Sequence, residues 1–220
     1  MSVKYSELVE PRGEIINGEF QALPPPTPEH SRVQGVLRSE RSLGGFDDDG
    51  NRPDGDGPGG WWIFTEINIR LGTETYRPDL AGWKRERLPN PTVASPIIVT
   101  PDWICEVISP GNEKHDRVTK KRVYAEHGVS WYWIVDTRLR TLEAFELVTQ
   151  TTWQKVDKAK VSGQVKDDLF IEAHVQISHW LDIGAFDDTT IDARIRPFDI
   201  VALDVSRLFF PREMCEKRDK

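Results

Sequence analysis

The stretch PDWICEVISP, residues 101–110, places one carboxylate inside an otherwise apolar segment. Around Glu106 the residues Trp103, Ile104, Cys105, Val107 and Ile108 have the pattern of a strand that is buried on both faces. Desolvating an isolated carboxylate costs several kcal/mol unless the group is neutralised, paired or bound to a cation. We therefore expect a buried strand here, together with some group that holds Glu106 in place.

The residues before this strand predict a hairpin and a helix. Alternating side chains around Asn17-Gly18 are typical of a two-residue hairpin turn within residues 13–23. Thr27 is a suitable helix cap with Pro28 at the first helical position, and the apolar spacing of the helix continues to Leu43.

The centre of the chain predicts a mixed α and β core. Apolar strand patterns and one helical pattern follow the first helix, and we place them at residues 61–71, 76–84 and 101–109 (strands), 112–127 (helix) and 130–136 (strand). Gly128 has the position of a helix-ending glycine. After the hairpin, the predicted order is therefore helix, three strands, helix, strand.

We expect residues 1–210 to form one domain, and the remaining segments are interpreted within it. Residues 44–60, rich in Gly, Asp and Pro, predict a long loop or disordered insertion. Later segments predict a meander (141–148 and 151–156), a strand or short helix that closes the core (198–210) and a frayed charged tail (211–220).

Length and composition narrow the class of protein. The chain has 220 residues, enough for one well-buried core, and no apolar run approaches the roughly 18–20 residues that span a bilayer. The first residues lack the pattern of a signal peptide, and Cys105 and Cys215 are too few for a disulfide framework. We expect a cytoplasmic protein without a membrane partner.

Several catalytic motifs are excluded by their context. GDGPGG, residues 55–60, lacks the preceding strand and following helix of a dinucleotide-binding turn. No pair of histidines has H-x-x-x-H spacing, which argues against a histidine zinc site. Cys105 and Ser109 are the only support for a nucleophilic hydrolase, and strand alternation turns Cys105 away from Glu106.

Spacing along the strands favours Asp79 as the acidic partner of Glu106. Asp102 is four residues from Glu106 on the same strand, about 13 Å at 3.3 Å per residue, which is too far for one cation with ligands near 2.1 Å. Asp79 lies on the preceding strand, and neighbouring strands are about 4.8 Å apart. In a suitable register, Asp79 and Glu106 can therefore meet at one metal ion.

The helix after Glu106 supplies the third group. Asp116, Lys120 and Tyr124 are four residues apart and share one helix face. Two carboxylates suit Mg²⁺, which keeps water ligands that a substrate phosphate can displace. A nearby ammonium can orient a metal-bound water and stabilise charge that develops on the phosphate oxygens.

Each of these residues also has a purely structural interpretation. Glu106 can belong to a buried ion pair, Asp79 to turn chemistry after Pro78, and Lys120 to a surface pair with Asp116. The three possible accessory residues have structural interpretations too. Glu66 can be a solvated strand position, and Glu29 and His30 can provide charge and capping near a helix start.

Three segments together resemble a known family. They are YRPDLAGW (76–83), PDWICEVISPGNEKHDRVTKKRVYAEHGVSWYWIVD (101–136) and RTLEAFEL (140–147). With the N-terminal GEIINGEF and PPPTPEHSRV, they are similar to the Uma-two family of restriction endonucleases, a bacterial branch of the PD-(D/E)XK nuclease superfamily, over roughly residues 10–205. The resemblance implies the fold class: an α/β (α+β) protein with a restriction-endonuclease-like core, a mixed central sheet flanked by helices, an N-terminal hairpin and C-terminal strand additions.

The resemblance also implies a role for individual residues. Asp79 and Glu106 take the acidic positions that bind Mg²⁺, or Mn²⁺ in its place, in an endonuclease that hydrolyses DNA. The superfamily's lysine is usually two residues after the second acid, where this chain has Ile108, and Lys120 on the helix takes its place.

Partner expectations follow from charge. The net charge is −7, which argues mildly against a nucleic-acid partner, but basic residues cluster after the buried strand. We expect DNA phosphate contacts from Arg117, Lys121, Arg122, Lys84, Arg85 and Arg87. A homodimer would allow double-strand cleavage. The rival hypothesis is a non-catalytic interaction or nucleic-acid-binding module on the same scaffold.

Overall fold

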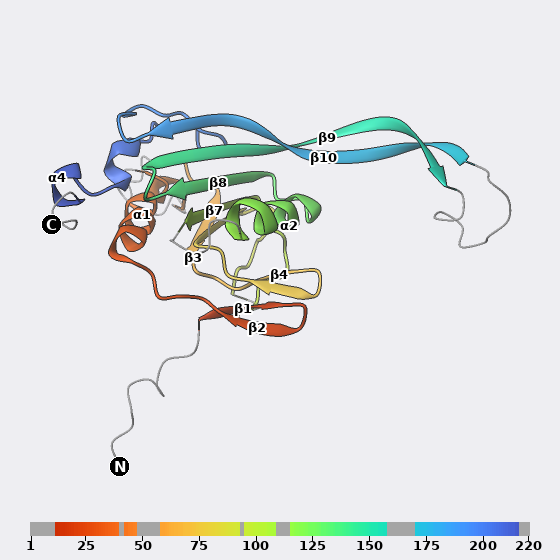
Figure 1. The fold of residues 1–220 in the computed structure, drawn as a ribbon, viewed down its shortest axis with the longest axis horizontal. Helices are drawn as coiled ribbons and strands as arrows, with labels where there is room; N and C mark the ends of the chain where they lie inside the picture. The colour runs from red at the N-terminus through yellow and green to blue at the C-terminus, as the bar shows by residue number, and fades with distance from the viewer. Residues whose placement is uncertain are drawn as a thin grey trace, which may run out of the picture.

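A six-stranded mixed sheet forms the centre of the protein in the computed structural model, which describes residues 12–39, 42–47, 58–92, 95–108, 115–157 and 170–215 (Figure 1). The strand order is β10-β9-β8-β7-β6-β3. Only β7 and β8 are parallel, and the other neighbours are antiparallel. The strands are β3 (Trp61–Thr65), β6 (Leu80–Lys84), β7 (Trp103–Ile108), β8 (Trp131–Asp136), β9 (Thr141–Asp157) and β10 (Phe170–Asp187).

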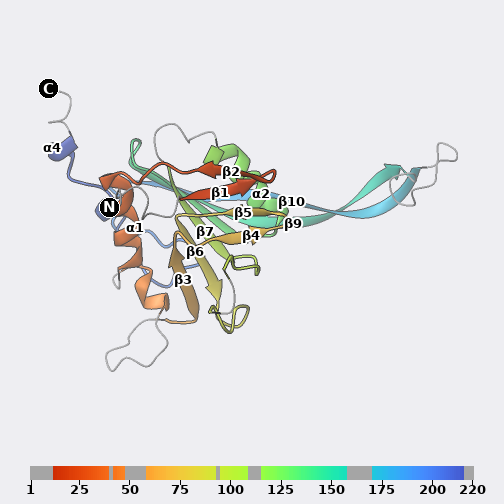
Figure 2. The same cartoon turned by 90° about the horizontal axis from the view of Figure 1, so that it is seen from below.

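A second, smaller sheet has the order β2-β1-β5-β4. It consists of β1 (Gly13–Ile16), β2 (Glu19–Ala22), β4 (Ile69–Leu71) and β5 (Glu74–Tyr76). The predicted hairpin is confirmed as β1 and β2, joined at Asn17 and Gly18, which both have positive φ. The hairpin lies beside β4 and β5 in both views (Figures 1 and 2).

Two strand predictions were wrong in extent. Residues 61–71 form β3 and β4, which belong to different sheets, and residues 76–84 are likewise divided between the end of β5 and β6. The first break falls at Glu66, whose φ of 51° is incompatible with an extended strand. These breaks let the chain change sheets, and they leave Glu66 and Asp79 at strand ends.

The helices follow the sequence signals, with one change in type. Helix α1 (Pro28–Arg38) is capped by the Thr27 side chain, which accepts a hydrogen bond from the backbone N–H of His30 at 3.2 Å. It ends before Leu43 because Ser39 is extended. The second predicted helix is a π-helix, η3 (His115–Lys120), that continues as α2 (Lys121–Glu126), and its predicted start at 112–114 lies outside the described residues.

Two apolar cores lie on opposite faces of the central sheet. On one face, α1 and the C-terminal segment pack against β7 and β8, with Val33, Leu37, Trp133 and Phe198 among the buried side chains. On the other face, α2 and the small sheet pack through residues such as Tyr76, Ile104 and Tyr124. Strand β7 is therefore buried along its whole length, as predicted.

The later part of the chain differs most from expectation. The predicted meander is a single long strand, β9, which pairs with β10 as a hairpin that extends away from the body (Figures 1 and 2). Strand β10 was not predicted. Segment 198–210 closes the core through Phe198, Leu203 and a 3-10 turn, η4 (Val205–Leu208), and contains no long element.

Short helices occur at one end of the predicted loop and at the start of the predicted tail. Residues 44–47 form a 3-10 helix, η2 (Gly44–Asp47), with Phe46 buried, whereas residues 48–57 lie outside the described residues. A short helix, α4 (Arg212–Cys215), begins the tail, and Arg212 pairs with Asp188 at 2.6 Å. None of the helices in the described ranges is long and apolar enough to cross a membrane.

Candidate active site

Strand β7 presents Glu106 to one side of the sheet and Cys105 to the other. Cys105 belongs to the apolar core under α1, together with Trp103 and Val107. Glu106 is 2% exposed and faces the side covered by η3, α2 and the small sheet. The alternation expected from the sequence therefore separates the thiol from the carboxylate.

The helix after β7 supplies the partners of Glu106. Lys120 Nζ lies 3.1 Å from Glu106 Oε1, and the Tyr124 hydroxyl donates to the same oxygen at 2.6 Å. Asp116 Oδ1 lies 3.5 Å from Lys120 Nζ. Lys120 and Asp116 are 3% and 6% exposed, so the surface-pair interpretation of these two residues was wrong.

The pairing of β6 with β7 brings Asp79 to Glu106. Leu80 is opposite Cys105 in this antiparallel register. Continuing the register by one residue places Asp79 beside Glu106. Asp79 Oδ2 accepts a hydrogen bond from the backbone N–H of Val107 at 2.7 Å, and Asp79 Oδ1 lies 2.8 Å from His30 Nε2. Asp79 is thus fixed by one contact to β7 and one to α1, which is more than turn chemistry requires.

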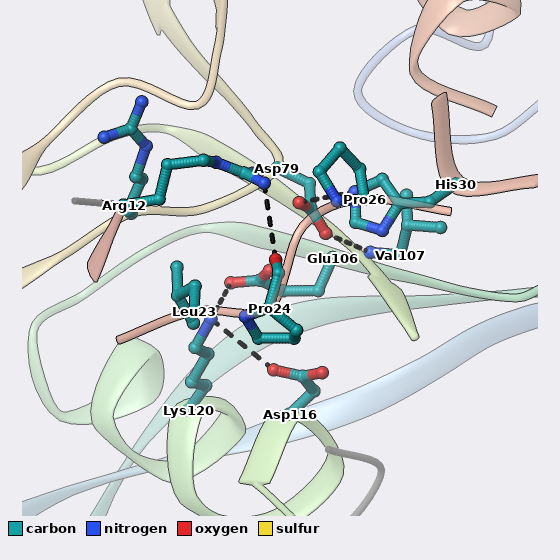
Figure 3. Close-up of a pocket in the computed structure, with 11 residues that line it drawn as sticks. Arg12, Leu23, Pro24, Pro26, His30, Asp79, Glu106, Val107, Asp116 and Lys120 are labelled. Atoms are coloured by element: carbon teal, nitrogen blue, oxygen red, sulfur yellow. Dashed lines mark hydrogen bonds and ion pairs between the residues drawn. The ribbon is translucent and has the colours of Figure 1, made fainter. Parts of the chain in front are cut away.

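All three predicted catalytic residues line one pocket, with a cavity of about 40 Å³ (Figure 3). That space holds a few water molecules. Asp79 reaches it from the end of β6, Glu106 from β7 and Lys120 from η3. The rest of the wall is formed by Arg12, Leu23, Pro24, Pro26, His30, Arg77, Val107 and Asp116.

Burial and contact with neighbouring charges shift the pKa values of Glu106 and Lys120 in this site. Burial raises the pKa of Glu106 well above its ordinary value; Lys120 opposes the rise, and Asp79 and Asp116 add to it. Burial by itself would lower the pKa of Lys120, but Glu106 and neighbouring carboxylates outweigh burial and raise it well above normal. Around Glu106, the nearby carboxylates therefore add to the cost of a further negative charge, and Lys120 offsets part of that cost.

One member of this cluster was missed by the sequence analysis. Glu14 on β1 is 1% exposed, and its Oε1 lies 3.0 Å from Lys120 Nζ. Burial acts to raise its pKa, but hydrogen bonds and charge from His115, Lys120 and the Arg77 N–H leave the pKa lowered. In sequence, Glu14 is an ordinary polar residue in a hairpin strand, so no local signal distinguishes it.

Three residues offer donor atoms for a metal ion at the edge of the pocket. One ligand atom each from His30, Glu66 and Asp79 lie within 4.8 Å of one another. Glu66 is also paired with Arg12 at 2.6 Å. Two of the predicted accessory residues, Glu66 and His30, are thus placed beside Asp79, whereas Glu29 lies in the first turn of α1 and does not line the pocket.

The basic residues predicted to contact phosphate have partners within the protein. Arg117 pairs with Glu143 at 2.7 Å and with Asp136 at 3.1 Å. Lys121 lies 3.1 Å from the centre of the Phe145 ring, and Arg122 pairs with Glu126 at 3.8 Å on the exposed side of α2.

The second basic group lies at the end of β6 remote from Asp79. Lys84 is over the Trp131 ring, Arg85 stacks 3.9 Å from the centre of the Trp62 ring, and Arg87 pairs with Asp102 at 2.7 Å. None of these three residues lines the pocket. Arg12 and Arg77, which do line it, were not singled out in the sequence.

A mixed central sheet flanked by helices, with an N-terminal hairpin and C-terminal strands added, is the fold predicted for a restriction-endonuclease-like protein. The chain is similar to a crystal structure described as a putative nuclease belonging to DUF820 from Anabaena variabilis, with a TM-score of 0.54 over 91% of this chain and 90% of the other. Sequence identity is 17%, so this likeness concerns the fold.

The family follows from the sequence match. A model of the Uma2 family, described as "Putative restriction endonuclease", matches residues 3–177, and the protein belongs to this family. No curated protein matches the chain. The predicted family and the predicted fold class are both confirmed.

Proposed function

We propose that this protein is a divalent-metal-dependent nuclease that hydrolyses DNA phosphodiester bonds at the pocket of Asp79, Glu106 and Lys120. The observation that carries the proposal is their convergence: three charged side chains from separate elements are buried around one small polar cavity. Keeping such groups buried is costly, and clusters with perturbed pKa values are typical of functional sites.

The residues present fit a divalent cation. Lys120 and Tyr124 both donate to Glu106 Oε1, and within the described residues Oε2 of Glu106 has no such donor. Asp79, the predicted first ligand, has His30 and Glu66 within reach as additional donors. Carboxylate oxygens suit Mg²⁺ and Mn²⁺, and an imidazole nitrogen favours the more transition-metal-like of the two, Mn²⁺.

The side chains of the pocket have distinct roles in the proposed reaction. A bound Mg²⁺ or Mn²⁺ supplies Lewis-acid polarisation and a more acidic water. Lys120 stays protonated, donates to a water in the cavity and stabilises negative charge on the phosphate oxygens. Tyr124 and Lys120 together fix the Glu106 side chain through its Oε1, which leaves Oε2 for a metal ion.

Arg12 and Arg77 are the best-placed groups for a substrate phosphate, since both line the pocket. Contacts from Arg117, Lys121, Arg122, Lys84, Arg85 and Arg87 remain predictions, and each would require the residue to leave or share its present partner. Such contacts position a duplex without reading its sequence. A homodimer, with one pocket in each chain, remains the predicted route to double-strand cleavage.

The rival hypothesis, a nucleic-acid-binding or interaction module without catalysis, also has an observation in its favour. The three N–H donors of Lys120 face three carboxylates, at 3.0 Å (Glu14), 3.1 Å (Glu106) and 3.5 Å (Asp116). A lysine held in this way is suited to a structural role. As a catalytic group, Lys120 must exchange one of these contacts, most easily the longest, for a water.

Plasmid cleavage distinguishes the two hypotheses. Wild type should nick supercoiled DNA in Mg²⁺ or Mn²⁺ and not in chelator, and Glu106→Ala should lose at least about 100-fold in rate. Glu19→Ala, which removes an exposed carboxylate from β2, is the matched control and should nick like wild type. Unchanged nicking by Glu106→Ala would refute the assignment, and a wild type that never nicks would favour the rival.

A further inference from the structure

Strand β1 has an inverted side-chain pattern. Glu14 is 1% exposed and points into the protein, whereas its neighbour Ile15 is 41% exposed. A strand at the protein surface normally turns its apolar residue inward and its charged residue to solvent. Local departures of this kind cost stability and are typical of functional positions.

The buried carboxylate of Glu14 connects two parts of the pocket. Its Oε1 accepts a hydrogen bond from the backbone N–H of Arg77 at 3.0 Å and lies 3.0 Å from Lys120 Nζ. Its Oε2 lies 3.5 Å from His115 Nε2. Glu14 is therefore held by one group before β6 and by two groups on η3.

These contacts fix one proposed catalytic residue relative to another. Arg77 is two residues before Asp79, so the bond to its N–H anchors the segment that carries this acid. Lys120 is the amine of the proposed reaction, and its other close partners are Glu106 from β7 and Asp116 from η3. Only Glu14 reaches Lys120 from the small sheet, among the residues that the structure describes.

We propose that Glu14 is a positioning residue, which holds the amine of Lys120 in register with Asp79. It acts through these two residues and does not contact the substrate. The inference rests on the proposed nuclease function, because it assigns Lys120 a task that requires orientation. It also explains why the hairpin of β1 and β2 is packed against the catalytic core.

Kinetics test this role through three variants. Glu14→Ala should lower kcat about 10- to 100-fold, the usual effect of removing a supporting residue, with KM for plasmid nearly unchanged. Glu14→Gln should recover much of kcat, because its amide oxygen can accept the same two hydrogen bonds. Glu19→Ala on β2 is the control. A Glu14→Ala protein that is folded and keeps wild-type kcat would overturn the proposal, as would a loss confined to KM.

A measurement independent of cleavage separates this proposal from the proposed function. The ¹⁵N signal of the Lys120 ammonium, assigned by its absence in Lys120→Arg, should be shifted or broadened in Glu14→Ala relative to wild type and Glu19→Ala, and less so in Glu14→Gln. An unchanged signal in the folded Glu14→Ala protein would show that Glu14 does not position the amine. Absence of cleavage by wild type in any metal, with the shift present, would overturn the nuclease function alone.

Discussion

Cys105 and Glu106 are adjacent on β7, and both are almost completely buried, yet they have opposite surroundings. The Cys105 thiol packs in an apolar core and, within the described residues, has no hydrogen-bond partner. Glu106 receives hydrogen bonds from Lys120 and Tyr124 and lies at a polar cavity with Asp79. Desolvation on burial raises the pKa of the Cys105 thiol and that of the Glu106 carboxyl, and neighbouring carboxylates raise both further.

The difference between these two faces shows that burial alone does not make a reactive site. A thiol can remain neutral in an apolar core at little cost, whereas a carboxylate requires partners. The partners of Glu106 come from separate segments of the chain, which the fold brings together at one face of β7. If the polar face depends on these partners and the Cys105 face does not, substitutions on the two faces should differ in their effects on stability, metal binding and pH dependence.

The largest effect on stability is expected from removing the Lys120 ammonium. Lys120→Met leaves Glu14, Glu106 and Asp116 buried without their shared partner, and we expect a loss of about 3–5 kcal/mol in the free energy of unfolding. Chemical denaturation in chelator measures it. Lys121→Met, the neighbouring residue on α2, should cost about 1 kcal/mol or less. Equal losses in both variants would contradict the central role of Lys120.

Metal binding should stabilise the polar face. A ligand that binds only the folded protein raises the free energy of unfolding by about 2.7 kcal/mol at 100 times its Kd. Thermal unfolding with and without Mn²⁺ or Mg²⁺ should show this rise in wild type and Cys105→Ala, and not in Asp79→Asn. The metal assignment fails if Asp79→Asn is stabilised as much as wild type.

The free energy of unfolding should depend on pH through Glu106. Because burial raises its pKa in the folded state above the ordinary 4.5, the folded protein binds more protons than the unfolded chain above that pH. The Glu106 contribution therefore decreases as pH rises from about 4.5 to its folded pKa, by at most about 1.4 kcal/mol per pH unit. Without metal, Glu106→Gln should lose this slope, and Cys105→Ala should keep it below pH 9. A wild-type slope in Glu106→Gln would contradict the assignment.

The smallest effect is expected on the apolar face. Cys105→Ala removes one buried sulfur and should lower the free energy of unfolding by about 1 kcal/mol, with the nicking rate unchanged. Denaturation and plasmid cleavage on the same preparation measure both. Loss of cleavage with only this small loss of stability would instead support a thiol nucleophile.

Much of the fold was predictable because its signals are local. The β1–β2 turn, the cap at Thr27 and the apolar runs of β7 and β8 depend on neighbouring residues, and each was found where the sequence placed it. The breaks near Glu66 and Asp79 were missed, because the chain changes sheets there without a strong turn sequence. The hairpin of β9 and β10 was underestimated, since long-range pairing leaves little trace in periodicity.

The site was predictable only in part, because some of its residues are brought together by long-range packing. Asp79, Glu106 and Lys120 could be singled out from strand spacing, helix periodicity and family resemblance, and the structure places all three at one pocket. Their roles in catalysis and metal binding stay predictions. Glu14, which contacts Lys120, and Arg12, which lines the pocket, could not be found, because their positions depend on how the N-terminal part of the chain packs against the rest.

By itself, the amino-acid sequence determined a buried strand with an acid at its centre, a helix face with Asp116, Lys120 and Tyr124, and the family, because these depend on residue type and short spacing. Only the tertiary structure decided which charges meet. Glu14, which precedes Lys120 by 106 residues in the chain, supplies one of the carboxylates around the central amine, and the contact exists because two sheets pack together around a charge that neither could bury alone.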